Sequence, residues 1–201
     1  MLVVVPLELG SSDFCIECWY YPVNFTNNIV LVGKRPDTTS VGSYVIYANS
    51  GAGAIGFYAS STGGSWNIWS GATVGTMVLN QWNHIALVRS GSTVKVYLNG
   101  VASSTTATNS STLGYNSSFY VGAVGTQSSG SVVGYLSNVR VVKGTAVYTS
   151  NFTPTTSPLT AITNTKLLTC QSNSFVDNSS NNITIAAGTT TVKPVAISPF
   201  T

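Results

Sequence analysis

The segment 81–101 constrains the fold most, because apolar and polar side chains alternate with a period of two on both sides of a tight turn. The first run spans 84–89 and the second spans 94–98. Gly91 separates the runs and can adopt the positive φ that a hairpin turn requires. Asn99-Gly100 then ends the second run as a turn dipeptide. The segment therefore predicts a β-hairpin.

Similar short runs recur along the chain between turn residues, and no sustained apolar spacing of three and four predicts a helix. A weak strand followed by a loop is expected within Ala102–Ser118. This spacing is typical of an all-β fold, a two-sheet antiparallel β-sandwich. The expected strands are Phe14–Pro22, Ile29–Gly33, Ser43–Tyr47, Ala54–Ala59, Trp66–Trp69, Thr73–Leu79, His84–Arg89, Val94–Leu98, Phe119–Val124, Val132–Val142 and Lys166–Cys170.

Charged residues make up only 6% of the 201 residues and the net charge is +3, so the surface is polar mainly through hydroxyls and amides. Lys34-Arg35 is the only basic pair, and we expect no nucleic-acid partner. No apolar run approaches the roughly 20 residues of a membrane helix, so no membrane insertion is expected. Met1–Pro6 lacks the basic leader of a signal peptide, which favours export within an assembly or a longer chain.

Cys15 and Cys18 have the spacing of a metal or redox motif, but they lie inside a predicted strand. An offset of three turns their side chains to opposite faces, so they can neither bind one metal ion nor bond to each other. We expect both to be buried as small apolar side chains. A disulfide from either one to Cys170 remains an open alternative.

Three blocks of the sequence, in this order, resemble the laminin-G-like branch of the concanavalin A-like lectin and glucanase jelly rolls. They are Phe14-Cys-Ile-Glu-Cys-Trp-Tyr-Tyr-Pro22, Trp82-Asn-His-Ile-Ala-Leu-Val-Arg89 with Val94–Gly100, and Gly134-Tyr-Leu-Ser-Asn-Val-Arg-Val-Val-Lys-Gly144 with Ala146-Val-Tyr-Thr and Asn151-Phe-Thr-Pro154. The resemblance implies a jelly-roll domain over residues 1–170, with two antiparallel sheets of about seven strands each. Only Met1–Leu9 precedes the first block, so the family's first strand is short here or supplied differently.

Two shorter stretches, 141–148 and 167–173, are similar to modules in the virion structural proteins of tailed phages, especially marine ones. This similarity implies a decoration, fibre or tail component at the virion surface, with capsid or tail proteins as partners. Residues 171–201 are rich in Asn, Ser and Thr and are expected to form a closing strand or a C-terminal arm in a homo-oligomer. The alternative is a carbohydrate-binding module of a secreted or cell-surface protein.

Some relatives of this fold are glucanases, which need two carboxyl groups at a short fixed separation. Asp13 and Glu17 could share a strand face, but they would lie about 13 Å apart. We therefore expect no enzyme activity, no catalytic residue and no cofactor. The acidic residues of the chain are Glu8, Asp13, Glu17, Asp37 and Asp177.

Other candidate chemistry is also weak. His84 has no acidic neighbour in sequence to complete a hydrolase triad and is expected to be structural. Glu17 lies among apolar residues and would need a buried partner, which Arg89 or Arg140 could supply. Some laminin-G-like modules hold calcium through clustered carboxylates, whereas the three Asp here lie singly, so no metal site is assigned and a bound calcium ion remains open.

Aromatic side chains and amide donors are the usual means by which such sandwiches bind sugars. The candidate carbohydrate-binding residues are Trp66, Trp69, Tyr47 and Tyr58. Trp66 and Trp69 differ by three, so one should pack in the core and the other should be exposed. Trp19 and Trp82 fall in the family-like blocks and are expected in the core. The sequence thus predicts a non-catalytic module that mediates assembly contacts and binds cell-surface glycans weakly, with many copies acting together.

Overall fold

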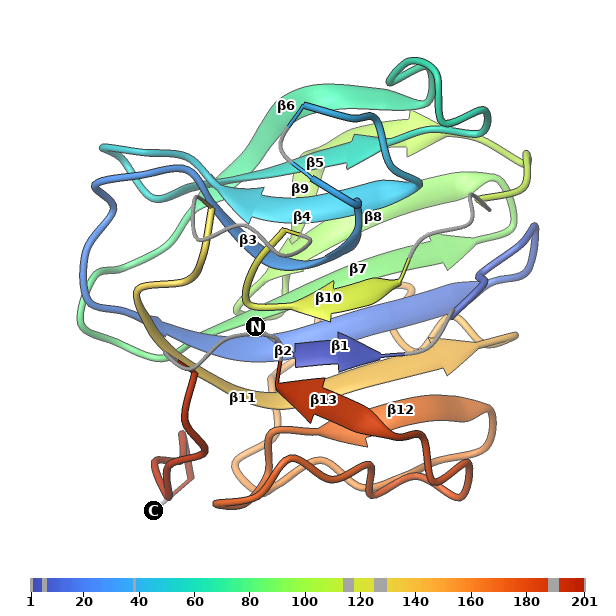
Figure 1. The fold of residues 1–201 in the computed structure, drawn as a ribbon. Helices are drawn as coiled ribbons and strands as arrows, with labels where there is room; N and C mark the ends of the chain where they lie inside the picture. Colours follow the sequence, from blue (N-terminus) through green and yellow to red (C-terminus); the bar gives the residue numbers. More distant parts are fainter. Residues whose placement is uncertain are drawn as a thin grey trace.

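The computed structural model describes residues 2–4, 7–37, 39–113, 118–124, 130–187 and 192–200. These residues form β-strands in two antiparallel sheets that pack face to face, as Figure 1 shows, which confirms the predicted all-β sandwich. No helix in this described part of the chain is long and apolar enough to cross a membrane.

The first sheet has seven strands, and in Figure 1 its order runs from β6 at the top to β13 at the bottom. Each neighbouring pair of strands in this sheet is antiparallel. Some neighbours follow each other in the sequence, and others are joined by longer crossover connections. The order is β13 (Ile185–Ala187), β1 (Leu2–Val4), β10 (Phe119–Val121), β3 (Ile29–Lys34), β4 (Tyr44–Ala48), β5 (Ala54–Ala59) and β6 (Trp69–Thr76).

The second sheet has six strands and lies behind the first in the view of Figure 1. This sheet contains the predicted hairpin, which pairs Ser90 with Thr93 around the turn at Gly91. The order is β12 (Thr165–Thr169), β11 (Gly134–Lys143), β2 (Phe14–Pro22), β7 (Asn83–Ser90), β8 (Thr93–Leu98) and β9 (Val101–Thr108).

Alternation along the strands fills the space between the sheets with one apolar core. Tyr44, Ile46 and Ala48 of β4 point into it, as do Val94 and Val96 of β8. Each sheet covers the apolar face of the other, so this core needs no further layer of structure to bury it. The period-two pattern of the sequence therefore determines which side chains are buried.

The cysteines follow the predicted strand geometry. Cys18 lies in the core between the sheets, whereas Cys15 packs in a smaller apolar cluster on the opposite face of β2. That outer cluster is covered by the segment after β11, through Tyr148 and Phe152, whose rings stack 3.6 Å apart. All three cysteines are free, so the structure contains no disulfide to Cys170.

The largest difference from the expected strands lies between β5 and β6. Two strands were expected at Trp66–Trp69 and Thr73–Leu79, but one strand, β6, begins at Trp69 and ends at Thr76. Trp66 lies in the preceding loop, where buried Ser60 accepts a hydrogen bond from the Gly63 amide at 2.9 Å. A side chain that satisfies loop amides competes with strand pairing, which sequence alternation alone does not reveal.

Candidate functional site

The outer face of the seven-stranded sheet carries three of the four candidate aromatic residues. Inward-pointing residues of β4 and β5 alternate with Tyr47 and Tyr58, which therefore face outward. The register places Tyr47 opposite Gly56, and Tyr58 opposite Ser70 of β6. Trp66 reaches the same face from the loop between β5 and β6.

These three rings form one stacked group, called here the aromatic cluster. The ring centroids of Tyr47 and Tyr58 are 5.0 Å apart with the planes inclined by 24°. The centroids of Tyr58 and Trp66 are 5.1 Å apart, inclined by 40°. Val30, Val45 and Val124 complete the apolar floor of the cluster. Stacking of this kind fixes the rings in place relative to one another.

Two glycines make room for the tyrosine rings. A Cβ at Gly56 would lie 2.1 Å from Cζ of Tyr47, and a Cβ at Gly71 would lie 2.5 Å from the Tyr58 hydroxyl. Tyr47 also donates a hydrogen bond from its hydroxyl to the Gly71 carbonyl at 3.0 Å. The rings therefore lie flat across β5 and β6, which is possible only where the neighbouring strands lack side chains.

The basic pair is divided between the two sides of β3. Lys34 points into the sandwich, where it is fully buried and forms an ion pair with Glu8. Arg35 lies on the outer side with its guanidinium carbon 5.6 Å from the Trp66 ring centroid. The Arg35 Nε donates to the Ser40 carbonyl at 2.8 Å, which orients the guanidinium. One positive charge thus lies beside the aromatic cluster.

The loop that carries Trp66 is held by its own polar side chains. The Ser61 amide donates to Oδ1 of Asn67 at 3.0 Å, and Nδ2 of Asn67 donates to Oγ of Ser61 at 2.9 Å. Asn67 is exposed and Trp66 is half-buried. The loop therefore presents an indole ring and amide groups together at the edge of the outer face, which is the combination used in sugar binding.

The fourth candidate residue, Trp69, lies on the other side of the sheet. It is buried in the core, where its ring packs edge-on against Phe57 with centroids 5.3 Å apart. The predicted opposition of Trp66 and Trp69 is thus present, with Trp69 as the core member. Within the cluster, Tyr47 is only 7% exposed, while Tyr58 and Trp66 are half-buried. Tyr58 and Trp66 are therefore the accessible members of the cluster, and the Tyr47 ring stacks on Tyr58.

Trp19 and Trp82 are not in the core as expected; both are half-buried on the outer face of the six-stranded sheet. Trp82 packs against Tyr21 with ring centroids 5.6 Å apart. Trp19 has the same parity as Glu17 in β2, so it faces outward, where the His84 ring packs against it at 5.1 Å. Their place in family-like blocks does not by itself decide which face they occupy.

Glu17 is the centre of a buried polar network on this second outer face. Nε and Nη2 of Arg140 donate to its Oε1 at 2.8 and 2.6 Å. Its Oε2 lies 3.0 Å from Nε2 of His84 and accepts a hydrogen bond from the Tyr148 hydroxyl at 2.8 Å. Burial alone would raise the pKa of Glu17, but the His84 hydrogen bond and the Arg140 charge outweigh it and lower the pKa.

The network explains several residues at once. Arg140 is the partner of Glu17, whereas Arg89 makes different contacts near the start of β2. His84 does have an acidic neighbour, Glu17, although the two are 67 residues apart in sequence. The neighbouring Cys15 thiol is fully buried, and burial raises its pKa, so it is not a nucleophile in this setting.

Each of the five carboxylates is engaged by protein groups. Asp177, for example, accepts hydrogen bonds from the amides of Leu168 and Ile183 at 3.0 and 2.8 Å, which ties the chain after β12 to that strand. Among the described residues, no group of three or more His, Cys, Asp or Glu could hold a metal ion. The remaining pairs are Glu8 with Lys34, Asp13 with the Gly91 amide, Glu17 with Arg140, and Asp37 with the Thr39 and Ser40 amides.

Two antiparallel sheets packed face to face define a β-sandwich of the jelly-roll type. The profile of the concanavalin A-like lectin/glucanases superfamily, in its laminin-G form, matches residues 3–165. The chain belongs to this superfamily. No curated protein sequence matches the chain.

Solved structures with the same fold are distant in sequence. A protein of Bacteroides ovatus, described as a candidate carbohydrate-binding protein, has a TM-score of 0.62 at 16% identity over 98% of this chain. The chain spans 59% of that protein. A heptameric pentraxin from Limulus polyphemus has a TM-score of 0.52 at 17% identity, covering 73% of this chain and 70% of its own.

Domain 4 of an extracellular arabinanase from Geobacillus stearothermophilus, solved with arabinotriose, is similar at a TM-score of 0.50. It is 21% identical and covers 69% of this chain and 66% of its own. At these identities the similarities show the fold alone, so the function has to be argued from the residues of this chain.

Proposed function

We propose that this protein is a non-catalytic glycan-binding module whose ligand contacts the aromatic cluster of Tyr47, Tyr58 and Trp66. The observation that carries the proposal is the position of this cluster on the outer face of the seven-stranded sheet, where it is only partly covered. Tyr58 and Trp66 are half-buried and Tyr47 is buried, so the contact area is limited, each site binds weakly and many copies are needed for firm attachment.

The chemistry around the cluster fits a hydroxylated ligand. Asn67 and Ser70 are exposed, the first beside Trp66 in the loop and the second opposite Tyr58 in the sheet. Together they offer amide and hydroxyl groups next to apolar ring surface, which suits the polar and apolar faces of a sugar.

A glycosidase role is disfavoured by the carboxylates. A hydrolase of this kind needs one carboxyl group as acid and a second as base or nucleophile, both open to substrate. Glu17 is fully buried and held by Arg140, and the other four carboxylates are bound to an ion-pair partner or to backbone amides. Among the described residues, no hydrogen bond or ion pair joins one of these carboxylates to a residue of the aromatic cluster.

A glycan array followed by calorimetry on the best ligand would test the proposal. Trp66→Ala should weaken binding at least about fivefold, because removing a stacked ring costs about 1 kcal/mol or more. Trp82→Ala is the matched control, since Trp82 is also half-buried but lies on the other sheet. Equal affinity of the wild type and Trp66→Ala would contradict the proposed site.

We also propose that the module is displayed on a virion surface and contacts capsid or tail proteins. The support is the similarity of segments 141–148 and 167–173 to phage structural modules. Cryo-electron microscopy of the native particle should then show symmetric contacts between this chain and a neighbouring virion protein. A purified chain that is monomeric and binds defined oligosaccharides without any particle would favour the alternative, a module of a secreted or cell-surface protein.

A further inference from the structure

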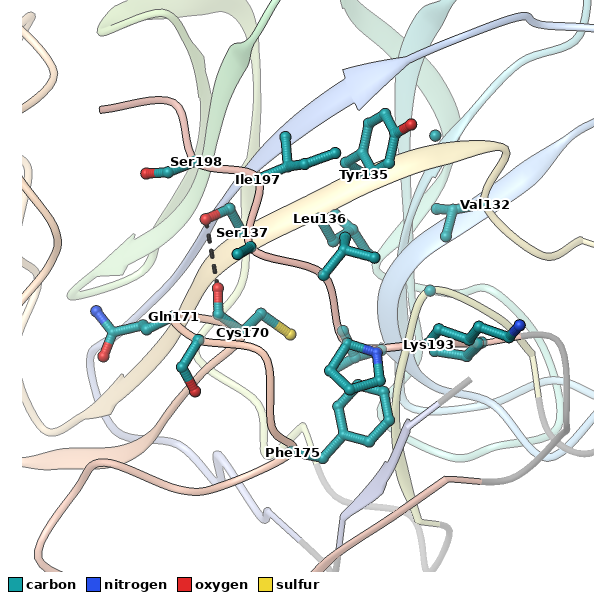
Figure 2. A pocket seen from close by; sticks show the side chains of 18 residues that line it. Val132, Tyr135, Leu136, Ser137, Cys170, Gln171, Phe175, Lys193, Ile197 and Ser198 are labelled. Atoms are coloured by element: carbon teal, nitrogen blue, oxygen red, sulfur yellow. Dashed lines mark hydrogen bonds between the residues drawn. The ribbon is translucent and has the colours of Figure 1, made fainter. Parts of the chain in front are cut away.

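A hollow of about 460 Å³ lies beside the start of β11, as Figure 2 shows. Apolar side chains such as Leu136 and Phe175 line most of it, and segment 192–198 of the same chain forms one wall. That segment already covers the apolar surface, so this hollow does not point to an external ligand. A second hollow, on the outer face of the six-stranded sheet, differs from it in chemistry.

The second hollow has a volume of about 190 Å³ and is called here the Lys95 pocket. Val94 and Val96 of β8 point into the core, so Lys95 between them faces outward. The register places Lys95 opposite Val88 of β7, which belongs to the outer apolar cluster. The lining residues are Val88, Ser90, Thr93, Lys95, Tyr97, Tyr148 and Thr149.

Several polar groups of the Lys95 pocket have no partner within the protein. Among the described residues, the Lys95 ammonium forms no ion pair, and the hydroxyls of Ser90, Thr93 and Thr149 form no hydrogen bond. No carboxylate lines the pocket. Lys95 is half-buried, so an anion that replaces water there would accept a charge-assisted hydrogen bond from the ammonium. The pocket therefore favours an anionic ligand.

The walls of the pocket are fixed by contacts within the protein. The Tyr148 ring stacks on Phe152 with centroids 3.6 Å apart, and the Phe152 amide donates to the Gly100 carbonyl at 2.9 Å. The Tyr97 hydroxyl donates to the Tyr148 carbonyl at 3.4 Å, which joins two of the lining residues. The Tyr148 hydroxyl donates to Glu17 at 2.8 Å. A site ordered in advance loses less conformational entropy when a ligand binds.

Size and charge restrict what the Lys95 pocket can bind. Its volume of about 190 Å³ is below the roughly 300–1,000 Å³ of pockets that bury a drug-sized molecule, so it suits one small ligand or one terminal group. One lysine balances one negative charge, whereas a phosphate group carries about −1.5 to −2 charges at neutral pH. The free hydroxyls beside the ammonium can bond to hydroxyl groups of the ligand, because each both donates and accepts.

We propose that the Lys95 pocket binds the carboxylate of a small hydroxylated acid. The Lys95 ammonium pairs with the carboxylate, and the hydroxyls of Ser90, Thr93 and Thr149 bond to the ligand's hydroxyl groups. The pocket lies on the opposite sheet from the aromatic cluster, so this site does not depend on the glycan-binding function proposed above.

NMR titration of the ¹⁵N-labelled full-length chain tests the proposal, with glucuronate, acetate, glucose and inorganic phosphate as probes. Glucuronate should shift the amide resonances of residues 88–95 and of Thr149, and it should bind there more tightly than the other three probes. Equal affinity for glucose would show that the charge is not recognised, and equal affinity for acetate would show that the hydroxyls are not. Tighter binding of phosphate would contradict a site for a carboxylate.

Variants of the pocket give a second test, with the affinity read from the same resonances. Lys95→Met removes the charge but keeps an unbranched side chain, so it should weaken glucuronate binding at least about tenfold. Lys193→Met removes the same charge at an exposed position and is the matched control. Unchanged affinity in Lys95→Met, or an equal loss in Lys193→Met, would overturn the proposal.

Two further variants separate this site from its surroundings. Thr149→Val replaces one hydroxyl by a methyl group and should weaken glucuronate binding about threefold. Trp66→Ala should leave it unchanged, because Trp66 lies on the outer face of the other sheet. If Trp66→Ala weakens glucuronate binding and Thr149→Val does not, glucuronate binds at the aromatic cluster and the proposal is wrong.

Discussion

Glu17 of β2 and Arg140 of β11 are 123 residues apart in sequence, yet two guanidinium nitrogens of Arg140 donate to one carboxylate oxygen of Glu17. Both side chains are almost fully buried on the outer face of the six-stranded sheet, under the segment that carries Tyr148. A buried ion pair contributes little compared with apolar packing, but breaking one partner leaves an uncompensated charge. The pair therefore makes the fold sensitive to any change at Glu17.

Glu17→Gln should lower the free energy of unfolding by about 3 kcal/mol, because Arg140 would remain buried without its counter-charge. For a chain of this size that loss lowers the melting temperature by roughly 6–12 °C. Urea denaturation followed by Trp fluorescence measures the effect. Glycan binding should not change, since Glu17 lies on the other sheet from the aromatic cluster. A melting temperature equal to that of the wild type would contradict the structural role of the pair.

The contribution of Glu17 should also depend on pH. Because the folded-state pKa of Glu17 is lowered, its stabilisation is complete above the unfolded-state pKa of about 4.3 and is lost as the pH falls through the folded-state value. The stability difference between the wild type and Glu17→Gln should therefore be largest near neutral pH and shrink in acid. Denaturation curves at a series of pH values measure it. A difference that stays constant down to acid pH would argue against this linkage.

Arg89 should tolerate no substitution, including lysine. It is fully buried at one end of β7, and its guanidinium donates to the carbonyls of Gly10, Ser12 and Ser111 at 2.5 to 2.9 Å. A lysine cannot span three carbonyls with the same fork, so Arg89→Lys should cost about 2 kcal/mol of unfolding free energy. Lys193→Arg, at an exposed position, is the control. If Arg89→Lys is as stable as the wild type, the prediction is wrong, and the three carbonyls accept hydrogen bonds from other groups in the variant.

Gly56→Ala should disturb the aromatic cluster without removing a ring. The added methyl would overlap the Tyr47 ring and displace it and Tyr58, which stacks on it. We expect a stability loss of about 1–3 kcal/mol and a weakened glycan affinity. Gly64→Ala, in the loop before Trp66, meets only one atom within 4 Å and should change neither quantity. Glycan affinity is measured by calorimetry, and an unchanged affinity in Gly56→Ala would show that the glycan does not bind at the aromatic cluster.

The position of each strand was largely predictable, because period-two alternation and turn residues are local properties. The hairpin at Gly91 and the opposite faces of Cys15 and Cys18 follow from spacing alone. Trp19 and Trp82 were placed wrongly in the core, because their position in family-like blocks does not say which face of the sheet a side chain occupies. The single strand β6 in place of two expected strands has another origin, because Ser60 bonds locally to the amide of Gly63, and period-two alternation does not register such turn contacts.

The sequence by itself determined an all-β chain whose inward residues are set by parity, because a strand has only two faces and the core must be apolar. Tertiary structure alone decided which distant residues meet: Arg140 rather than Arg89 at Glu17, His84 beside them, and Gly56 and Gly71 beneath the tyrosine rings. Such contacts depend on the order and register of strands that are far apart along the chain. Local alternation restricts the register to shifts that keep apolar side chains inward, but it does not say which strands are neighbours.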